Sequence, residues 1–165
     1  MKSSKTIGAV ILTAAIAISA TAVISSKASK ASPAIVAGDY VNSLTAALGY
    51  DVVSYHTTGG PSRGSGDHVA IHEGVTYLFE NRANRKQFEK NPSRYVPAYG
   101  GYCAYGVSVG KKFIGDPEVW GLVDDKLYLN LNRDVQKIWN EDTAGKIQEA
   151  DQNWPQIREK APHDL

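Results

Sequence analysis

The side chains of this sequence that could bind a soft metal ion are one thiol, Cys103, and a few imidazoles. Thiolate sulfur and imidazole nitrogen are ligands that copper and zinc take in proteins. We therefore predict a site for copper or zinc in which Cys103 and His56 are joined by His68 or His72. In an extended strand the imidazoles of His68 and His72 would lie about 13 Å apart, so both can join one site only if the strand twists or bulges. A lone cysteine also excludes zinc sites that need two cysteines from one chain.

Cys103 lies among glycines and tyrosines, in the segment Gly100–Gly106. Glycine lets the backbone approach a bound group closely, and tyrosine hydroxyls donate hydrogen bonds, so Tyr102 and Tyr105 are predicted to contact a bound ligand. Two other interpretations of Cys103 stay open, a buried core residue and a redox-reactive thiolate. His56 precedes a glycine-rich loop, where it suits either the rim of a pocket or a surface hydrogen bond.

A β-hairpin and a helix are predicted upstream of Cys103. His68–His72 and Val75–Phe79 have the composition of two short strands, and Glu73-Gly74 between them forms a two-residue turn in which glycine supplies the positive φ. Asn81 is a candidate N-cap for an amphipathic helix that ends near Asn91-Pro92.

The same arrangement returns 51 residues later. Strands are predicted over Val119–Val123 and Lys126–Leu131, with the turn Asp124-Asp125, followed by a helix from Asn132 to about Ala150. An internal duplication explains the repeat, and the common residue usage of any hairpin-helix unit is the alternative. The sequence predicts an α+β fold in which two hairpin-plus-helix units pack around one core. The matched residues are Tyr77 and Tyr128, Leu78 and Leu129, Asn81 and Asn132, Arg82 and Arg133, Lys86 and Lys137, and the aromatic pair Phe88 and Trp139.

The remaining boundaries follow from local patterns. Apolar residues at Tyr40, Leu44 and Leu48 predict a short helix, and Asp51–His56 is predicted to be extended. We expect a single domain over residues 39–160, with a short tail over 161–165.

The N-terminal residues have the pattern of a secretory signal peptide. Lys2 and Lys5 precede an uncharged apolar run over Ile7–Ile24, and Ala20 and Ala22 form an A-x-A site. We expect cleavage after residue 22, then a flexible tether over 23–38, and a periplasmic or secreted protein. An uncleaved membrane anchor is the alternative, because the run approaches the ~20 residues that span a bilayer.

Several separated words of the sequence resemble a known family. The run Val75–Phe79 with Phe88, Asn91-Pro92 and Tyr95 is similar to the YHS domain, a small metal-associated module. Over about residues 48–157 the chain resembles the exported bacterial YHS domain-containing proteins. The words that carry this closer resemblance are Gly49–Val53, Tyr99–Tyr105, Leu127–Asn130 and Ala150–Pro155.

The metal ligands of the family's metal-binding modules have no counterpart here. Cysteines directly follow the second strand in those relatives and recur four residues later, whereas this chain has Glu80 and Asn84. A carboxylate and an amide do not replace two soft thiolates. The resemblance therefore implies the fold and export, and it does not supply the ligand set.

Composition narrows the function classes. The chain has 165 residues, 42% hydrophobic and 21% charged, as expected for one soluble domain, and its net charge of +1 without a long basic run argues against nucleic-acid binding. No spacing of carboxylates marks an acid/base pair, which favours a binding protein over an enzyme. We expect a periplasmic YHS-family protein that binds copper, zinc or a related small ligand near Cys103, with no membrane contact after cleavage. An interaction or scaffold module with Cys103 in its core, or a thiol-based redox protein, is the alternative.

Overall fold

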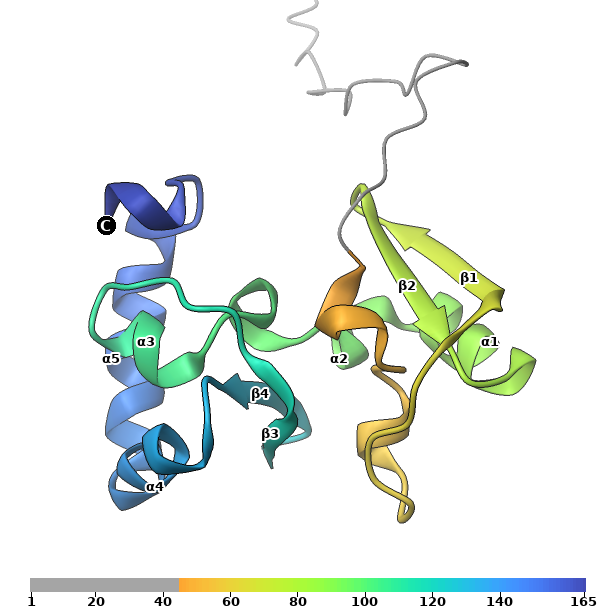
Figure 1. The fold of residues 1–165 in the computed structure, drawn as a ribbon, viewed down its shortest axis with the longest axis horizontal. Helices are drawn as coiled ribbons and strands as arrows, with labels where there is room; N and C mark the ends of the chain where they lie inside the picture. The colour runs from red at the N-terminus through yellow and green to blue at the C-terminus, as the bar shows by residue number, and fades with distance from the viewer. Residues whose placement is uncertain (1–44) are drawn as a thin grey trace, which may run out of the picture. The chain divides into compact units, whose positions relative to one another are not determined.

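Two antiparallel hairpins, each followed by helices, form the part of the chain that the computed structural model describes, residues 45–165 (Figure 1). The predicted α+β class is confirmed. The predicted signal peptide, the tether and residues 39–44 of the predicted domain lie outside the described residues. The elements in chain order are η1 (Ala46–Gly49), η2 (Ser54–His56), β1 (Ser65–His72), β2 (Val75–Phe79), α1 (Arg82–Lys90), α2 (Pro92–Tyr95), η3 (Ala98–Gly101), α3 (Ala104–Ser108), β3 (Asp116–Val123), β4 (Lys126–Asn130), α4 (Arg133–Glu141), α5 (Thr143–Ile157) and η4 (Pro162–Asp164).

The two hairpin-helix units repeat each other in geometry. Every bound of β1, β2 and α1 returns 51 residues later in β3, β4 and α4. The strand registers also match, and each first strand carries a bulge, between Ser65 and Val69 and between Asp116 and Trp120. Both turns have two residues with positive φ, and both helices begin with an asparagine that accepts a backbone N–H. An origin by internal duplication stays a prediction.

The predicted helix from Asn132 to Ala150 is wrong in its continuity, because it is two helices. Asp142 separates them with a non-helical backbone (φ −148°, ψ 67°), and its carboxylate accepts a hydrogen bond from the Gly145 N–H at 3.0 Å. Asp142 therefore both terminates α4 and caps the start of α5. Asn91 has nearly the same backbone angles between α1 and α2.

The predicted extended segment Asp51–His56 is also wrong. It forms turns that end in η2, because the Asp51 carboxylate accepts the Val53 N–H at 2.8 Å and the Ser54 hydroxyl donates to the Asp51 carbonyl at 2.6 Å. Such local bonds compete with a strand. Leu48, predicted on a helical face, lies in a left-handed conformation (φ 51°) and is exposed.

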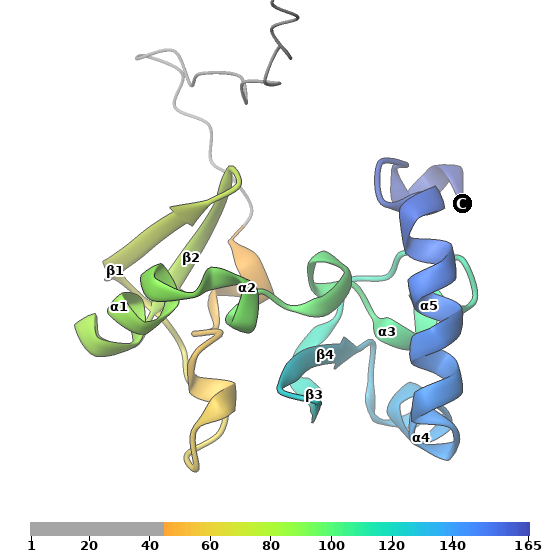
Figure 2. The ribbon, with the colours of Figure 1, turned by 180° about the vertical axis from the view of Figure 1, so that it is seen from behind.

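The buried apolar side chains divide into three clusters. One lies between the first hairpin and α1, around Phe79 and Phe88, and a second packs α3, α4 and α5 near the second hairpin (Figure 2). The third cluster, Tyr50, Tyr55, Leu127 and Leu129, joins the segment before β1, which we count with the first unit, to β4 of the second unit, so the two units share one part of their core. The predicted tail is partly packed, since Leu165 contacts the second cluster. Within residues 45–165 no helix is both long and apolar enough to cross a membrane.

Candidate functional site

Cys103 is fully buried at the start of α3. Its Sγ accepts a hydrogen bond from the Gly106 N–H at 3.3 Å and lies 3.8 Å from Oδ1 of Asn130, which is buried as well. Of the three interpretations of Cys103, this environment matches that of a core residue.

His56 is held between the two units. Only 5% of its side chain is exposed, its ring packs edge-on against Tyr95, and its Nδ1 lies 3.0 Å from Oδ1 of Asp125 in the β3–β4 turn. Arg94 binds the other oxygen of Asp125 at 2.8 Å. The His56 hydrogen bond, with a smaller contribution from Arg94, holds the pKa of Asp125 below its ordinary value. His56 therefore pairs with a carboxylate and an arginine.

The other two predicted histidines lie on β1. His68 is half-buried at the bulge, and His72 packs edge-on against Phe88, with its Nε2 4.0 Å from the Glu73 carboxylate. Among residues 45–165 no group of three or more histidine, cysteine, aspartate or glutamate side chains is arranged to hold a metal ion. Metal binding by Cys103 with His56, His68 or His72 stays a prediction from the sequence.

The two predicted tyrosines share part of their surroundings. Tyr102 and Tyr105 both pack against the second core cluster, and the ring of Tyr102 also lies under the ammonium of Lys112 at 4.7 Å and 6.3 Å from the ring of Trp154. Tyr102 also lines a small apolar cavity with Leu48 and Ile114. Of the predicted site residues, Tyr102 borders this cavity and His72 borders the larger one described next.

A larger cavity of about 510 Å³, which we call the aromatic pocket, lies where the two units meet α5. Four aromatic rings line it, those of Tyr77, Tyr99, Tyr128 and Trp154. The Tyr99 ring centroid lies 5.9 Å from that of Tyr128 and 5.8 Å from that of Trp154, so these three rings form one continuous wall. The charged and polar lining residues are His72, Glu73, Lys126, Asp151, Arg158 and Glu159.

Hydrogen bonds and burial set the protonation of this wall. The Tyr99 hydroxyl donates to Asp151 at 2.9 Å, and burial together with this bond raises the pKa of Tyr99 far above its ordinary value. Burial also raises the pKa values of Tyr77 and Tyr128 and lowers that of Lys126. The tyrosine hydroxyls consequently stay protonated at neutral pH and remain hydrogen-bond donors.

Sequence reasoning missed most of the aromatic pocket. Trp154 reads as an ordinary core aromatic, and Tyr99 stands in the segment before Cys103 without any pattern of its own. The one signal was the repeat, because Tyr77 and Tyr128 occupy the same position in the two units and both line the cavity.

Comparisons of the chain with protein-family models, with curated proteins and with solved structures find no match. The resemblance to the exported YHS proteins therefore stays an expectation from the sequence. The function must be argued from the chemistry of the cavities themselves.

Proposed function

We propose that this protein binds a small organic ligand with a flat apolar part in the aromatic pocket. The observation that carries the proposal is the single wall of three rings, from η3, β4 and α5, along a cavity of about 510 Å³. Cavities of this size with aromatic walls and a few converging polar groups are the usual form of small-molecule sites. Copper or zinc binding and export to the periplasm stay predictions from the sequence.

The polar residues indicate how such a ligand would be oriented. Arg158 and Glu159 pair with each other at 2.9 Å. Lys126 and Asp151 are two further lining residues of opposite charge that could orient a ligand. Asp151 already holds the Tyr99 hydroxyl, and the Nζ of Lys126 donates to the Ser93 carbonyl at 3.3 Å. Partial burial lowers the pKa of Lys126, because it removes water that stabilises the charged ammonium. An anionic group on the ligand would stabilise that charge in place of the water.

Titration of the full chain with indole and with indole-3-carboxylate tests the proposal. Both probes offer the same flat ring, and only the second offers an anion for Lys126. We expect both to shift the NMR signals of Tyr99, Tyr128 and Trp154, with Trp154→Leu weakening both by about tenfold or more.

Two lysine variants separate orientation from stacking. Lys126→Met should weaken indole-3-carboxylate about tenfold and leave indole unchanged, because it removes only the charge contact. Lys86→Met, at an exposed position of α1, is the matched control and should change neither affinity. If the probes shift no pocket signal in the folded wild-type chain, or if Trp154→Leu binds as well as wild type, the assignment is wrong.

A further inference from the structure

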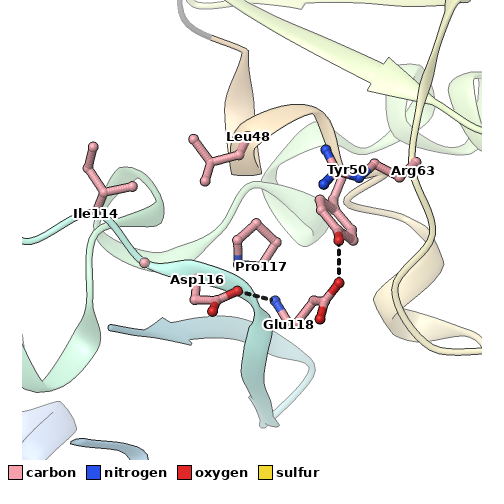
Figure 3. A pocket seen from close by; sticks show the side chains of 8 residues that line it. Leu48, Tyr50, Arg63, Ile114, Asp116, Pro117 and Glu118 are labelled. Carbon is pink, nitrogen blue, oxygen red and sulfur yellow. Dashed lines mark hydrogen bonds between the residues drawn. The ribbon is translucent and has the colours of Figure 1, made fainter. Parts of the chain in front are cut away.

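A third cavity, of about 400 Å³, combines charged and apolar groups in another part of the molecule (Figure 3). We call it the Arg63 pocket. The segment 48–63 of the first unit supplies one side, and residues 114–118, around the start of β3, supply the other. It shares no lining residue with the aromatic pocket. The lining side chains that the argument uses are Leu48, Tyr50, Arg63, Ile114, Asp116 and Glu118.

Arg63 presents an oriented guanidinium to this cavity. The guanidinium lies over the Tyr50 ring, 4.4 Å from its centroid, and the backbones of the two residues pair as an isolated antiparallel bridge. Among the described residues Arg63 takes part in no ion pair within 4.0 Å. A stacked guanidinium keeps its N–H edge for a planar anion, and a carboxylate fits that edge with two parallel hydrogen bonds.

Two carboxylates lie on the β3 side of the same cavity. The Tyr50 hydroxyl donates to Oε1 of Glu118 at 2.6 Å, and Oδ1 of Asp116 accepts the Glu118 N–H at 2.9 Å (Figure 3). These bonds hold both carboxylates in place and engage one oxygen of each. The pocket thus carries one positive and two negative charges, so it disfavours a purely anionic ligand and has acceptors for an ammonium group.

The remaining wall is apolar and exposed. Ile114 is 62% exposed and Leu48 is 49% exposed, and both stand apart from the Arg63 side chain (Figure 3). Leu48 also has a positive φ, which costs a leucine about 1 kcal/mol. Pro117 continues this wall. An apolar group of a ligand would cover surface that the fold leaves in water.

We propose that the Arg63 pocket binds a small zwitterion with an apolar side chain, of the class of the free α-amino acids. The ligand's carboxylate meets the guanidinium of Arg63, its ammonium meets Glu118 and Asp116, and its side chain covers Leu48 and Ile114. The site is independent of the proposed function of the aromatic pocket, because the two cavities share no residue.

Calorimetric titration of the full chain tests the ligand class with three related probes. L-leucine has both charges, 4-methylpentanoate lacks the ammonium, and 3-methylbutylamine lacks the carboxylate. We expect leucine to bind at least tenfold more tightly than either singly charged probe, since each charge-assisted contact contributes about tenfold or more. Equal affinity for leucine and one of the singly charged probes would refute the zwitterion.

Charge-removing variants then assign each contact. Arg63→Gln should remove the preference for leucine over 3-methylbutylamine, and Glu118→Gln should remove the preference over 4-methylpentanoate. Arg82→Gln, at an exposed position of α1, is the matched control, and Trp154→Leu should leave leucine binding unchanged. The proposal fails if leucine at about 10 mM gives no binding heat with the folded wild-type chain, or if Arg63→Gln binds leucine as wild type does.

Discussion

The buried side chain of Lys112 holds the C-terminal part of the fold in place. It is only 7% exposed, and its Nζ donates to the carbonyl oxygens of Lys160 at 2.6 Å, Arg158 at 3.0 Å and Ile157 at 3.5 Å. The Ile157 and Arg158 carbonyls lie at the end of α5 and that of Lys160 lies just beyond it, and the Ile157 oxygen also accepts the Lys160 N–H at 2.9 Å. The ammonium also lies over the rings of Tyr102 and Trp154. Lys112 therefore caps α5 and anchors it to the segment after α3.

Lys112→Met isolates this role, because methionine keeps most of the apolar stem and removes the charged donor. A hydrogen bond to a charged group contributes about 1.5–3 kcal/mol, and two of the three bonds are short, while water can reach part of the helix end. We expect the variant to lose about 2–4 kcal/mol of unfolding free energy. For a chain of this size that loss lowers Tm by about 6–12 °C.

Urea unfolding followed by tryptophan fluorescence and by circular dichroism measures this loss. Lys111→Met is the matched control, because Lys111 is the exposed neighbour, and its unfolding free energy should stay within about 0.5 kcal/mol of wild type. A loss below about 1 kcal/mol for Lys112→Met would refute the argument, since it would mean that water replaces the ammonium at no cost.

Two further perturbations test the close packing at Gly115 and the contacts that Asp125 makes with His56 and Arg94. Gly115→Ala should lower the unfolding free energy by about 1–3 kcal/mol, because the added Cβ would lie 2.5 Å from the Leu129 Cβ. Gly66→Ala, which has open space around its Cβ, should show the Tm of wild type in the same thermal melt. Asp125 contributes stability that is fully present above its unfolded pKa and is lost as pH falls through its lower folded pKa, since its pKa is depressed on folding. Asp125→Asn should therefore flatten the loss of stability as the pH falls below about 4, and an unchanged acid profile would show that the His56 and Arg94 contacts contribute nothing.

Short-range patterns were enough to predict the hairpins. Glu73-Gly74 and Asp124-Asp125 both adopt the positive φ values of a two-residue turn, and β2 has the predicted bounds. The strands that precede these turns begin three residues earlier than predicted, because a bulge lets each continue past its regular pairing. The break at Asp142 was missed because the helical pattern runs through it, and only the cap geometry shows that the aspartate ends one helix and starts the next.

The cavities depended on contacts between residues far apart in the sequence, which no local pattern reports. Ligand chemistry alone points to His56 and Cys103 in the sequence, yet His56 pairs with Asp125 and Cys103 lies in the core. No local sequence pattern distinguishes Arg63 from the other arginines. Its stacking on Tyr50 and its position opposite Glu118 exist only in the folded chain.

The geometric repeat gives a physical reason for the sequence environment of Cys103. The Asp51 N–H donates to the Ser62 carbonyl at 2.9 Å, and the Cys103 N–H donates to the Phe113 carbonyl at 2.8 Å, so the two residues hold equivalent places. The three residues with positive φ that end in Gly49 return in those that end in Gly101. Their offset is 52 rather than 51, which is why an ungapped comparison of the two units does not find them.

The equivalent places of Asp51 and Cys103 explain why glycines precede Cys103. The Asp51 carboxylate there accepts the Glu80 N–H at 2.9 Å and the Asn84 side-chain amide at 2.7 Å, which ties the start of the first unit to its hairpin and helix. Cys103 contacts the second hairpin through Asn130 instead, whose Nδ2 is buried without a partner among residues 45–165. The glycines serve the left-handed backbone before it, so the fold by itself requires them at this position.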